Sequence, residues 1–387
     1  MRIALVNLGR VNNAFGGTEK VFFDMANNLS RRGHEVVAIV YDTHRGSPAF
    51  TVDKAVEYHN CKVSLLHNLW LQAYRRVAPL LATKDNRVKT KIDSKYIPRA
   101  LQIKKVIGRM PEVDVFISFQ AAATYLLLDV LKVEQPVITM SHSKPEYRDD
   151  ETQVYLGALR RSACVQVLMP EYVDIAKEAL REVNVVAIPN IVPQYLKTSS
   201  LRNPVIINVA RISKSIKRQW LIVEAFAKIA QKYPEWTVEL WGEKYEHPKD
   251  TQHLESTIRR LGLQGRVRLC GSTKDVPSVL TTGSIFCFPS AVEGMPLAMT
   301  EAMSMGLPVI GCQECSSVNS IIRDGENGFL CESSADEISK KLDILMSDFE
   351  LRKQLGAQAK TDMLKYSPDV VWQQWEDLIV SVIKGNK

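Results

Sequence analysis

The chain has 387 residues, of which 45% are apolar and 24% charged, and its net charge is +7. This length predicts two or three domains with sizeable cores, and the ordinary composition excludes a disordered or low-complexity protein. No apolar run approaches the roughly 20 residues of a membrane span. Seven scattered cysteines favour a reducing cytosol. The apolar run within residues 1–9 is too short for a signal peptide and leads directly into sequence typical of a folded domain.

Short β-branched runs alternate with helical patterns along the whole chain. In the first half the predicted strands are Ile3–Asn7, Glu35–Tyr41, Asp114–Phe119, Val137–Met140, Val165–Leu168 and Val185–Ile188. In the second half they are Val205–Val209, Thr237–Trp241, Val267–Cys270, Ile285–Phe288 and Val309–Ile310. Apolar strands spaced by helices predict parallel sheets covered on both faces. Because the pattern occurs twice, we predict two Rossmann-like, doubly wound α/β domains that face a cleft.

Prolines mark the expected boundary between these domains, at positions 189, 193 and 204. We therefore predict a first domain over 1–195 and a second over 204–367. The last segment, 368–387, has an amphipathic pattern and is predicted to cross back to the first domain as a helix. Ligands of such folds bind at the carboxyl ends of the strands, so the cleft between the domains is the expected site.

Two motifs in the first domain follow predicted strands. Gly16 and Gly17 open a helix, and glycines allow a ligand to approach the backbone closely. A Gly-Gly pair is also common in a plain turn, so both interpretations stay open. His142 follows the strand Val137–Met140 and is either structural or directed into the cleft. Gly33 and His34 close the first helix and are interpreted as structural.

The segment between Trp70 and Met110 is strongly basic. It carries eleven Lys and Arg against Asp85 and Asp93, a net charge of +9, whereas the rest of the chain sums to −2. A solvated helical face is one explanation. The interleaved apolar residues suggest instead a surface for anionic lipid or a diphosphate-bearing ligand. Nucleic acid is a weaker alternative, because no nucleic-acid motif accompanies the charge. The interleaved residues are Trp70, Leu71, Tyr74, Val77, Leu80, Leu81, Tyr96 and Ile97.

A basic loop follows the first strand of the second domain. Arg211 and Lys217 suit a diphosphate, Arg by a forked contact and Lys as a point charge. Lys214 and Arg218 are interpreted as the solvated members. Cys312 and Cys315 form a lone CxxC without a partner pair, which does not predict a metal site.

Glu293 and Glu301 stand eight residues apart around Gly294 and Pro296. We predict that Pro296 is the first residue of a helix, with Glu301 about two turns inside it. The backbone amides from Gly294 to Leu297 then face an anion. Two carboxylates also suggest glycoside hydrolysis. However, eight helical residues rise about 12 Å, which favours two contacts with one long ligand over two catalytic groups at one bond.

The segment Glu293-Gly-Met-Pro-Leu-Ala-Met-Thr-Glu301 resembles the E-x7-E motif of retaining glycosyltransferases of family 4 (GT4), which have the GT-B fold. The likeness extends over nearly the whole chain and is weakest from about residue 45 to 110. It includes Gly16-Gly17, Pro189-Asn190, Arg211 with Lys217, Pro289-Ser290 and the run Ile322-Arg-Asp-Gly-Glu-Asn-Gly-Phe-Leu.

This resemblance implies a role for each matched residue. Arg211 and Lys217 bind the donor diphosphate and stabilise the leaving nucleotide. Glu293 holds the sugar hydroxyls, and Glu301 accepts from the ribose. His142 lies near the reacting centre. The remaining implied donor contacts are Gly16, Gly17, Gly271, Val276, Gly294, Met295, Pro296 and Leu297. Many relatives have Gly where Pro296 stands, so one possible amide donor is missing here.

The resemblance also implies the substrates and the chemistry. A nucleotide sugar, with UDP the commonest base, donates a hexosyl or N-acetylhexosaminyl group with retention. No metal or other cofactor is expected: no DxD motif appears, and two fixed cations can neutralise a diphosphate.

The implied acceptor is a glycan, linked to a lipid such as polyprenyl diphosphate, at the cytoplasmic face of the plasma membrane. Its diphosphate or anionic lipid is expected to contact Arg87, Lys89, Lys91, Lys104 and Lys105. A nucleotide-sugar epimerase and a degenerate, non-catalytic GT-B subunit are the alternatives.

Overall fold

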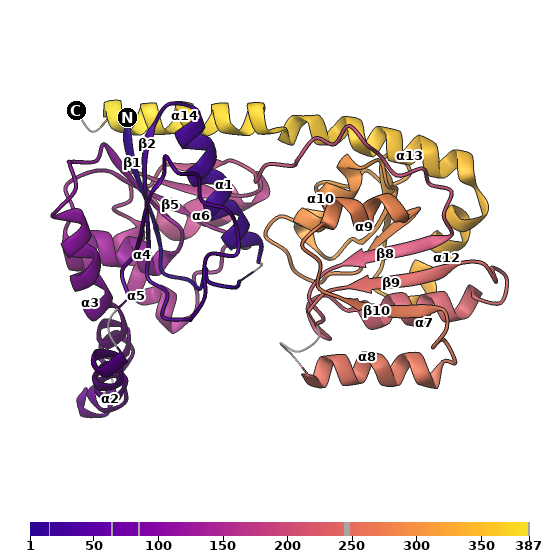
Figure 1. Cartoon of the computed structure of the whole chain (residues 1–387), viewed down its shortest axis with the longest axis horizontal. Helices are drawn as coiled ribbons and strands as arrows, with labels where there is room; N and C mark the ends of the chain where they lie inside the picture. The colour runs from indigo at the N-terminus through magenta and orange to yellow at the C-terminus, as the bar shows by residue number, and fades with distance from the viewer. Residues whose placement is uncertain (15, 63–64, 84–85, 244–247, 386–387) are drawn as a thin grey trace. The chain divides into compact units, whose positions relative to one another are not determined.

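The computed structural model describes residues 1–387 except 15, 63–64, 84–85, 244–247 and 386–387. It divides into two compact units, one of Met1–Pro189 with Trp372–Lys387 and one of Asn190–Val371. Figure 1 shows the helices and strands of each unit. The predicted pair of parallel-sheet α/β domains is confirmed, because each unit contains one parallel sheet.

The first unit contains a seven-stranded sheet in the order β3-β2-β1-β4-β5-β6-β7. β1, β2, β4, β5 and β6 are buried almost throughout, as expected for β-branched runs covered on both faces. The strands are β1 Arg2–Asn7, β2 Glu35–Val40, β3 Glu57–Asn60, β4 Val115–Ser118, β5 Val137–Met140, β6 Cys164–Val167 and β7 Val185–Ala187.

Helices connect these strands. They are α1 Gly17–Arg31, α2 Leu65–Leu81, α3 Arg87–Ile107, α4 Ala121–Tyr125 with the π-helix Leu126–Leu131, α5 Asp150–Leu159 and α6 Glu171–Leu180. α1 ends at Arg31, and Gly33 shortly after it has a φ of +88°, the left-handed conformation in which glycine commonly terminates helices. None of the described helices combines the length and apolarity needed to cross a bilayer.

The second unit contains a six-stranded sheet in the order β10-β9-β8-β11-β12-β13. Its strands are β8 Val205–Val209, β9 Thr237–Trp241, β10 Val267–Gly271, β11 Ile285–Phe288, β12 Val309–Cys312 and β13 Gly328–Cys331. Its helices are α7 Gln219–Ile229, α8 Pro248–Arg260, α9 Val276–Thr282, α10 Leu297–Ser304, α11 Ser316–Asn319, α12 Ala335–Ser347 and α13 Phe349–Asp362, followed by the 3₁₀ turn Met363–Tyr366.

Two strands were missing from the sequence prediction. β3 is the polar segment Glu57-Tyr-His-Asn at one edge of its sheet, where a strand needs no continuous apolar run. β13 contains only four residues and begins with Gly328, a poor strand former. The eleven predicted strands all occur, and their ends differ from the prediction by at most two residues.

The last helix, α14 Pro368–Gly385, groups with the first unit from Trp372 onward. Trp372, Trp375 and Ile379 are buried along one of its faces. Glu376 accepts from Arg32 Nη2 at 2.5 Å and contacts His34 Nε2 at 3.0 Å. The hydrogen bond from Arg32 holds the pKa of Glu376 below its usual range. His34 therefore has a structural partner at the end of α1.

The order of strands reverses beside the first strand of each sheet. β1 lies between β2 and β4, and β8 lies between β9 and β11. In open parallel sheets, ligands bind beyond the carboxyl ends of the strands at this switch point. Each unit is therefore expected to present its binding residues after β1 and β4, or after β8 and β11.

Candidate active site

The loop after β8 is fixed by a buried glutamine. Gln219, the first residue of α7, is 1% exposed. Its side chain accepts from Ser213 N at 3.2 Å and donates to the carbonyls of Arg211 at 2.9 Å and Ala210 at 3.3 Å. One side chain thus holds both arms of the loop that carries Arg211 and Lys217. Sequence reasoning missed this residue, although a polar residue opening an apolar helix is a usable signal.

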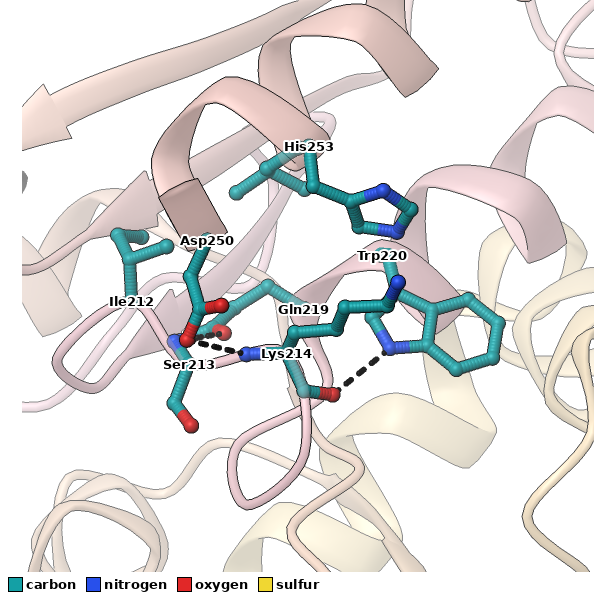
Figure 2. Close-up of a pocket in the computed structure, with 8 residues that line it drawn as sticks. Ile212, Ser213, Lys214, Gln219, Trp220, Asp250 and His253 are labelled. Atoms are coloured by element: carbon teal, nitrogen blue, oxygen red, sulfur yellow. Dashed lines mark hydrogen bonds between the residues drawn. The ribbon is translucent and has the colours of Figure 1, made fainter. Parts of the chain in front are cut away.

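A small pocket beside the same loop is shown in Figure 2. Asp250 of α8 accepts from Lys214 N at 3.1 Å, and Trp220 Nε1 donates to Lys214 O at 3.0 Å. The pocket holds about 10 Å³, room for about one water molecule. Its lining therefore acts as a support for the loop, and a nucleotide sugar does not fit inside it.

The loop after β11 is tied directly to the loop after β8. Ala291 N donates to Ile216 O at 2.8 Å, and Arg218 Nε donates to Pro289 O at 2.8 Å. Arg218 has a φ of +51°, an unusual conformation for a residue with a side chain. The interpretation of Arg218 as a solvated residue is wrong: its guanidinium joins the two loops, and Nη2 is buried.

Lys217 and Glu293 form an ion pair at this junction. Their side chains are 16% and 12% exposed. Lys217 Nζ also lies 5.7 Å from the centroid of the Phe288 ring, and Ser317 Oγ donates to Glu293 O at 3.3 Å. Arg211 is exposed on the same loop. The switch point of the second sheet thus combines a cation and a carboxylate that are both largely shielded from water.

The predicted helix start is wrong by one residue. Pro296 has φ −78° and ψ 76°, and Leu297 N donates to Met295 O at 2.9 Å. These values describe an inverse γ-turn, which proline's restricted φ favours. α10 begins at Leu297, and Glu301 is its fifth residue, little more than one turn inside. The Leu297 amide is used by the turn, so only the Gly294 and Met295 amides of the predicted run remain for an anion.

Glu301 lies on the buried side of α10 and is 8% exposed. The carbonyl of Glu301 accepts from Met305 N at 3.0 Å at the end of the helix. Within the segment from Glu293 to Glu301, only the residues from Leu297 onward are helical. That Glu293 and Glu301 contact one ligand stays a prediction.

The strip from Gly271 to Val276 is held beside the basic loop through Gly242. Gly242 N donates to Gly271 O at 2.8 Å, and Ala210 N donates to Trp241 O at 2.9 Å. A Cβ on Gly242 would lie 1.9 Å from Ala210 O, so only glycine fits here. Gly271 has a φ of +80°, and Val276 begins α9 behind the cap formed by Asp275. Gly242 was not among the predicted site residues.

In the first unit, Asp42 organises the loop that leads to Gly16 and Gly17. Asp42 is 2% exposed and accepts from Val11 N at 2.8 Å and Asn12 N at 2.7 Å. Burial acts to raise the pKa of this carboxyl, but these bonds and those from His44 hold it below its usual range. Gly16 caps α1 and lies against Glu19, so the Gly-Gly pair opens the helix as predicted.

His142 follows β5 and stacks on Phe119, which follows β4. Their ring centroids are 5.1 Å apart with an angle of 24°. Burial lowers the pKa of His142 to about 4, and Nε2 is buried without a hydrogen-bond partner in the described part of the chain. His142 is therefore uncharged at neutral pH, and its ring can donate or accept a hydrogen bond.

The basic segment forms α2 and α3, which Figure 1 shows on the side of the first unit away from α14. Lys89 pairs with Asp93 at 2.7 Å, and Lys91 pairs with Glu151 at 3.5 Å. Arg87, Lys104 and Lys105 are exposed and take part in none of the ion pairs of the described residues. Lys84, Asp85 and the side chains of Trp70, Leu71 and Leu81 lie outside that description.

Large apolar side chains are also exposed on these two helices. Leu80 is 68% exposed and Leu101 is 55% exposed. The others are Leu69, Tyr74, Val77 and Ile97. An exposed apolar stripe beside unpaired cations is typical of a helix that lies in a membrane interface.

Comparison with known proteins identifies the second half of the chain. The profile of the family described as "Glycosyl transferases group 1" matches residues 197–362. An uncharacterized glycosyltransferase of Haemophilus influenzae is 23% identical over 381 residues, 97% of this chain and 98% of that protein. The N,N'-diacetylbacillosaminyl-diphospho-undecaprenol alpha-1,3-N-acetylgalactosaminyltransferase of Campylobacter jejuni is 29% identical over 122 residues, 31% of this chain and 32% of the relative.

Solved structures share the fold of both units. Sucrose-phosphate synthase from Thermosynechococcus elongatus superposes with a TM-score of 0.79 at 14% identity, covering 99% of each chain. Anabaena HepE in complex with UDP and glucose has a TM-score of 0.71 at 17% identity, covering 98% of this chain and 100% of HepE. Residues 197–362 therefore form a glycosyl transferases group 1 domain, which supports a glycosyltransferase activity, and the chain shares the GT-B fold of its structural neighbours.

Proposed function

We propose that this glycosyltransferase is a retaining enzyme of the GT4 type, which transfers a hexosyl or N-acetylhexosaminyl group from a UDP-sugar to a lipid-linked glycan. The observation that carries the proposal is the shielded Lys217–Glu293 pair at the switch point of the second sheet. A sugar diphosphate presents an anion and hydroxyl groups side by side. A cation beside a carboxylate complements that combination.

The donor is proposed to bind along the loops after β8, β10 and β11. Lys217 and Arg211 take the diphosphate, and Glu293 accepts hydrogen bonds from the sugar hydroxyls. Glu301 accepts from the ribose, while Gly271 to Val276 face the base. Gly294 and Met295 supply the amides that remain beside Pro296.

In the proposed reaction the bond between the anomeric carbon and the β-phosphate oxygen breaks. The acceptor hydroxyl oxygen forms the new bond on the same face of the sugar, and its proton passes to the leaving phosphate. Lys217 and Arg211 stabilise the charge that develops on the diphosphate. The first unit is proposed to contribute Gly16, Gly17 and the neutral His142, which is suited to a hydrogen bond with the sugar. No metal ion takes part in this scheme.

UDP and a lipid-linked acceptor are supported by what related proteins are named for. HepE was solved with UDP, and the Campylobacter relative is named for an undecaprenyl-diphosphate acceptor. The exposed apolar residues and unpaired cations of α2 and α3 favour contact with an anionic membrane at the cytoplasmic face. The enzyme is proposed to bind there peripherally.

A donor panel tests the proposal. The purified protein is incubated with UDP-, GDP- and ADP-sugars without added metal, and nucleotide release is followed with and without a polyprenyl-diphosphate glycan extract. We expect release from a UDP-sugar that the extract accelerates, and an NMR spectrum of the product that shows the donor's anomeric configuration. Silence across the panel, or an inverted product, contradicts the proposal.

A further inference from the structure

Two arginines of the first unit lie together without a carboxylate. Arg75 of α2 and Arg99 of α3 take part in none of the ion pairs found among the described residues, and the Nε atom of each is buried without a hydrogen-bond partner. The Arg99 guanidinium lies 4.9 Å from the centroid of the Tyr41 ring and 5.2 Å from that of Tyr96. Stacking on these rings positions Arg99 but uses none of its N–H donors.

The surroundings disfavour the charge of Arg99. Burial above all, together with the nearby charge of Arg75, lowers the pKa of the Arg99 guanidinium. Desolvated like charges are costly unless a counter-ion accompanies them. Lys89 and Lys91 of α3 have such a partner, in Asp93 and Glu151. Arg87, Lys104 and Lys105 have none among the described residues, but their side chains are exposed to water. The arginine pair therefore stands out from the general basic character of the segment.

A third polar group at the same place also lacks a partner. Tyr41 is 3% exposed, and its hydroxyl is buried without a hydrogen bond in the described residues. Both Arg99 and Arg75 are close enough to oppose the rise in the Tyr41 pKa that burial causes. Buried polar groups are nearly always satisfied, so a buried hydroxyl and two buried Nε–H donors without partners indicate a missing acceptor.

We propose that Arg75, Arg99 and Tyr41 form a binding site for a phosphate or diphosphate group. Guanidinium groups and a hydroxyl all donate hydrogen bonds, and phosphate oxygens accept them in the forked geometry that arginine offers. Tyr41 directly follows Val40, the last residue of β2, so the site lies at the carboxyl edge of the first sheet. Arg75 and Arg99 belong to the basic segment, but none of these three residues is among the five lipid contacts that were expected there by number.

The identity of the phosphate rests on the proposed function. In a transferase that acts on a lipid-linked glycan, the acceptor's diphosphate is the group that such a site would hold. An anionic lipid headgroup offers the same chemistry, so the test includes both sources.

Calorimetric titration with inorganic pyrophosphate tests the site in the full chain. Arg75→Gln and Arg99→Gln are each expected to bind one pyrophosphate fewer than the wild type, or to bind it at least tenfold more weakly. Arg76→Gln is the matched control, because Arg76 is the exposed neighbour on the same helix. Equal binding by all four proteins, or an equal loss in Arg76→Gln, overturns the proposal.

Tyr41→Phe keeps the ring under Arg99 and removes only the hydroxyl. It is expected to weaken pyrophosphate binding severalfold while the melting temperature stays near that of the wild type. If the arginine variants fail to fold, Tyr41→Phe still tests whether the site binds pyrophosphate. Unchanged pyrophosphate binding by Tyr41→Phe would count against the site.

Two competition experiments distinguish an acceptor diphosphate from a lipid headgroup. Competition by a soluble short-chain polyprenyl diphosphate, but not by vesicles of phosphatidylcholine with phosphatidylglycerol, supports an acceptor diphosphate. The reverse supports a headgroup. If pyrophosphate binds as expected but no donor is used, the proposed function fails and the anion site stands. If transfer occurs and the arginine variants bind pyrophosphate normally, the anion site fails alone.

Discussion

Lys217 and Glu293 neutralise each other at the edge of the second sheet, although they come from loops that are 76 residues apart. Both side chains are largely shielded from water, at 16% and 12% exposed. Removing one partner of such a pair leaves the other charge unpaired where water reaches it poorly. We therefore expect the anion of a bound donor to compete with Glu293 for the lysine.

Glu293→Gln is expected to lower kcat/KM on the order of 100-fold, because the amide keeps the shape but loses the charge that binds the sugar hydroxyls. Steady-state kinetics with the donor identified by the panel measures this. Glu326→Gln, which changes an exposed carboxylate in the same unit, is the control and should retain full activity. Equal activity of the two variants would remove Glu293 from the site.

Gly242→Ala is expected to lower the free energy of unfolding by about 1–3 kcal/mol, as overpacking does, and to weaken donor binding. The added Cβ would lie 1.9 Å from Ala210 O, so the backbone of the basic loop must move. Gly265→Ala is matched to it, since nothing lies within 4 Å of the new Cβ there. Denaturant unfolding of both variants provides the comparison. Similar unfolding midpoints would contradict the close contact between position 242 and Ala210 O.

The pH dependence of stability reports on His142. A histidine in the unfolded chain titrates near about 6.5, whereas burial lowers the pKa of folded His142 to about 4. Between these values the unfolded state binds the proton more readily, so the free energy of unfolding falls as the pH drops. Between pH 7 and about 4.5, the melting temperature of His142→Asn should therefore fall by less than that of the wild type. Parallel losses would mean that His142 titrates normally in the folded chain.

Membrane binding should depend on the unpaired cations of α3. Replacing Arg87, Lys104 and Lys105 together by Gln is expected to weaken binding to anionic vesicles on the order of 100-fold, at about 1 kcal/mol per charge. A control with Lys197, Lys249 and Lys384 changed to Gln removes three exposed charges elsewhere. Co-sedimentation at low and high salt measures both. Equal binding by the two triple variants would contradict a role for α3.

Much of the fold could be predicted from the sequence, because buried parallel strands leave continuous β-branched runs. The edge strands β3 and β13 could not, since an edge strand such as Glu57–Asn60 is polar and only its neighbour reveals it. The same limit applies to long-range pairing. No local pattern predicts that Lys217 reaches Glu293, or that Arg218 turns inward to Pro289.

The site was predicted best where residue type dictates chemistry. Glu293, Lys217 and Arg211 could be selected because charge at a strand end is visible in sequence, and the structure brings Lys217 and Glu293 together. Pro296 was misplaced because proline suits both the first turn of a helix and a γ-turn. Gln219 and Gly242 were missed because their roles are hydrogen bonds and close contacts with distant backbone.

The most direct test of the account is the rate of nucleotide release by Lys217→Gln beside Lys214→Gln. Both changes remove one lysine from the same loop, but only Lys217 lies in the shielded pair, whereas Lys214 is exposed. We expect a loss on the order of 100-fold or more for Lys217→Gln and near-wild-type turnover for Lys214→Gln. Near-wild-type turnover by Lys217→Gln would contradict the assignment of the donor site.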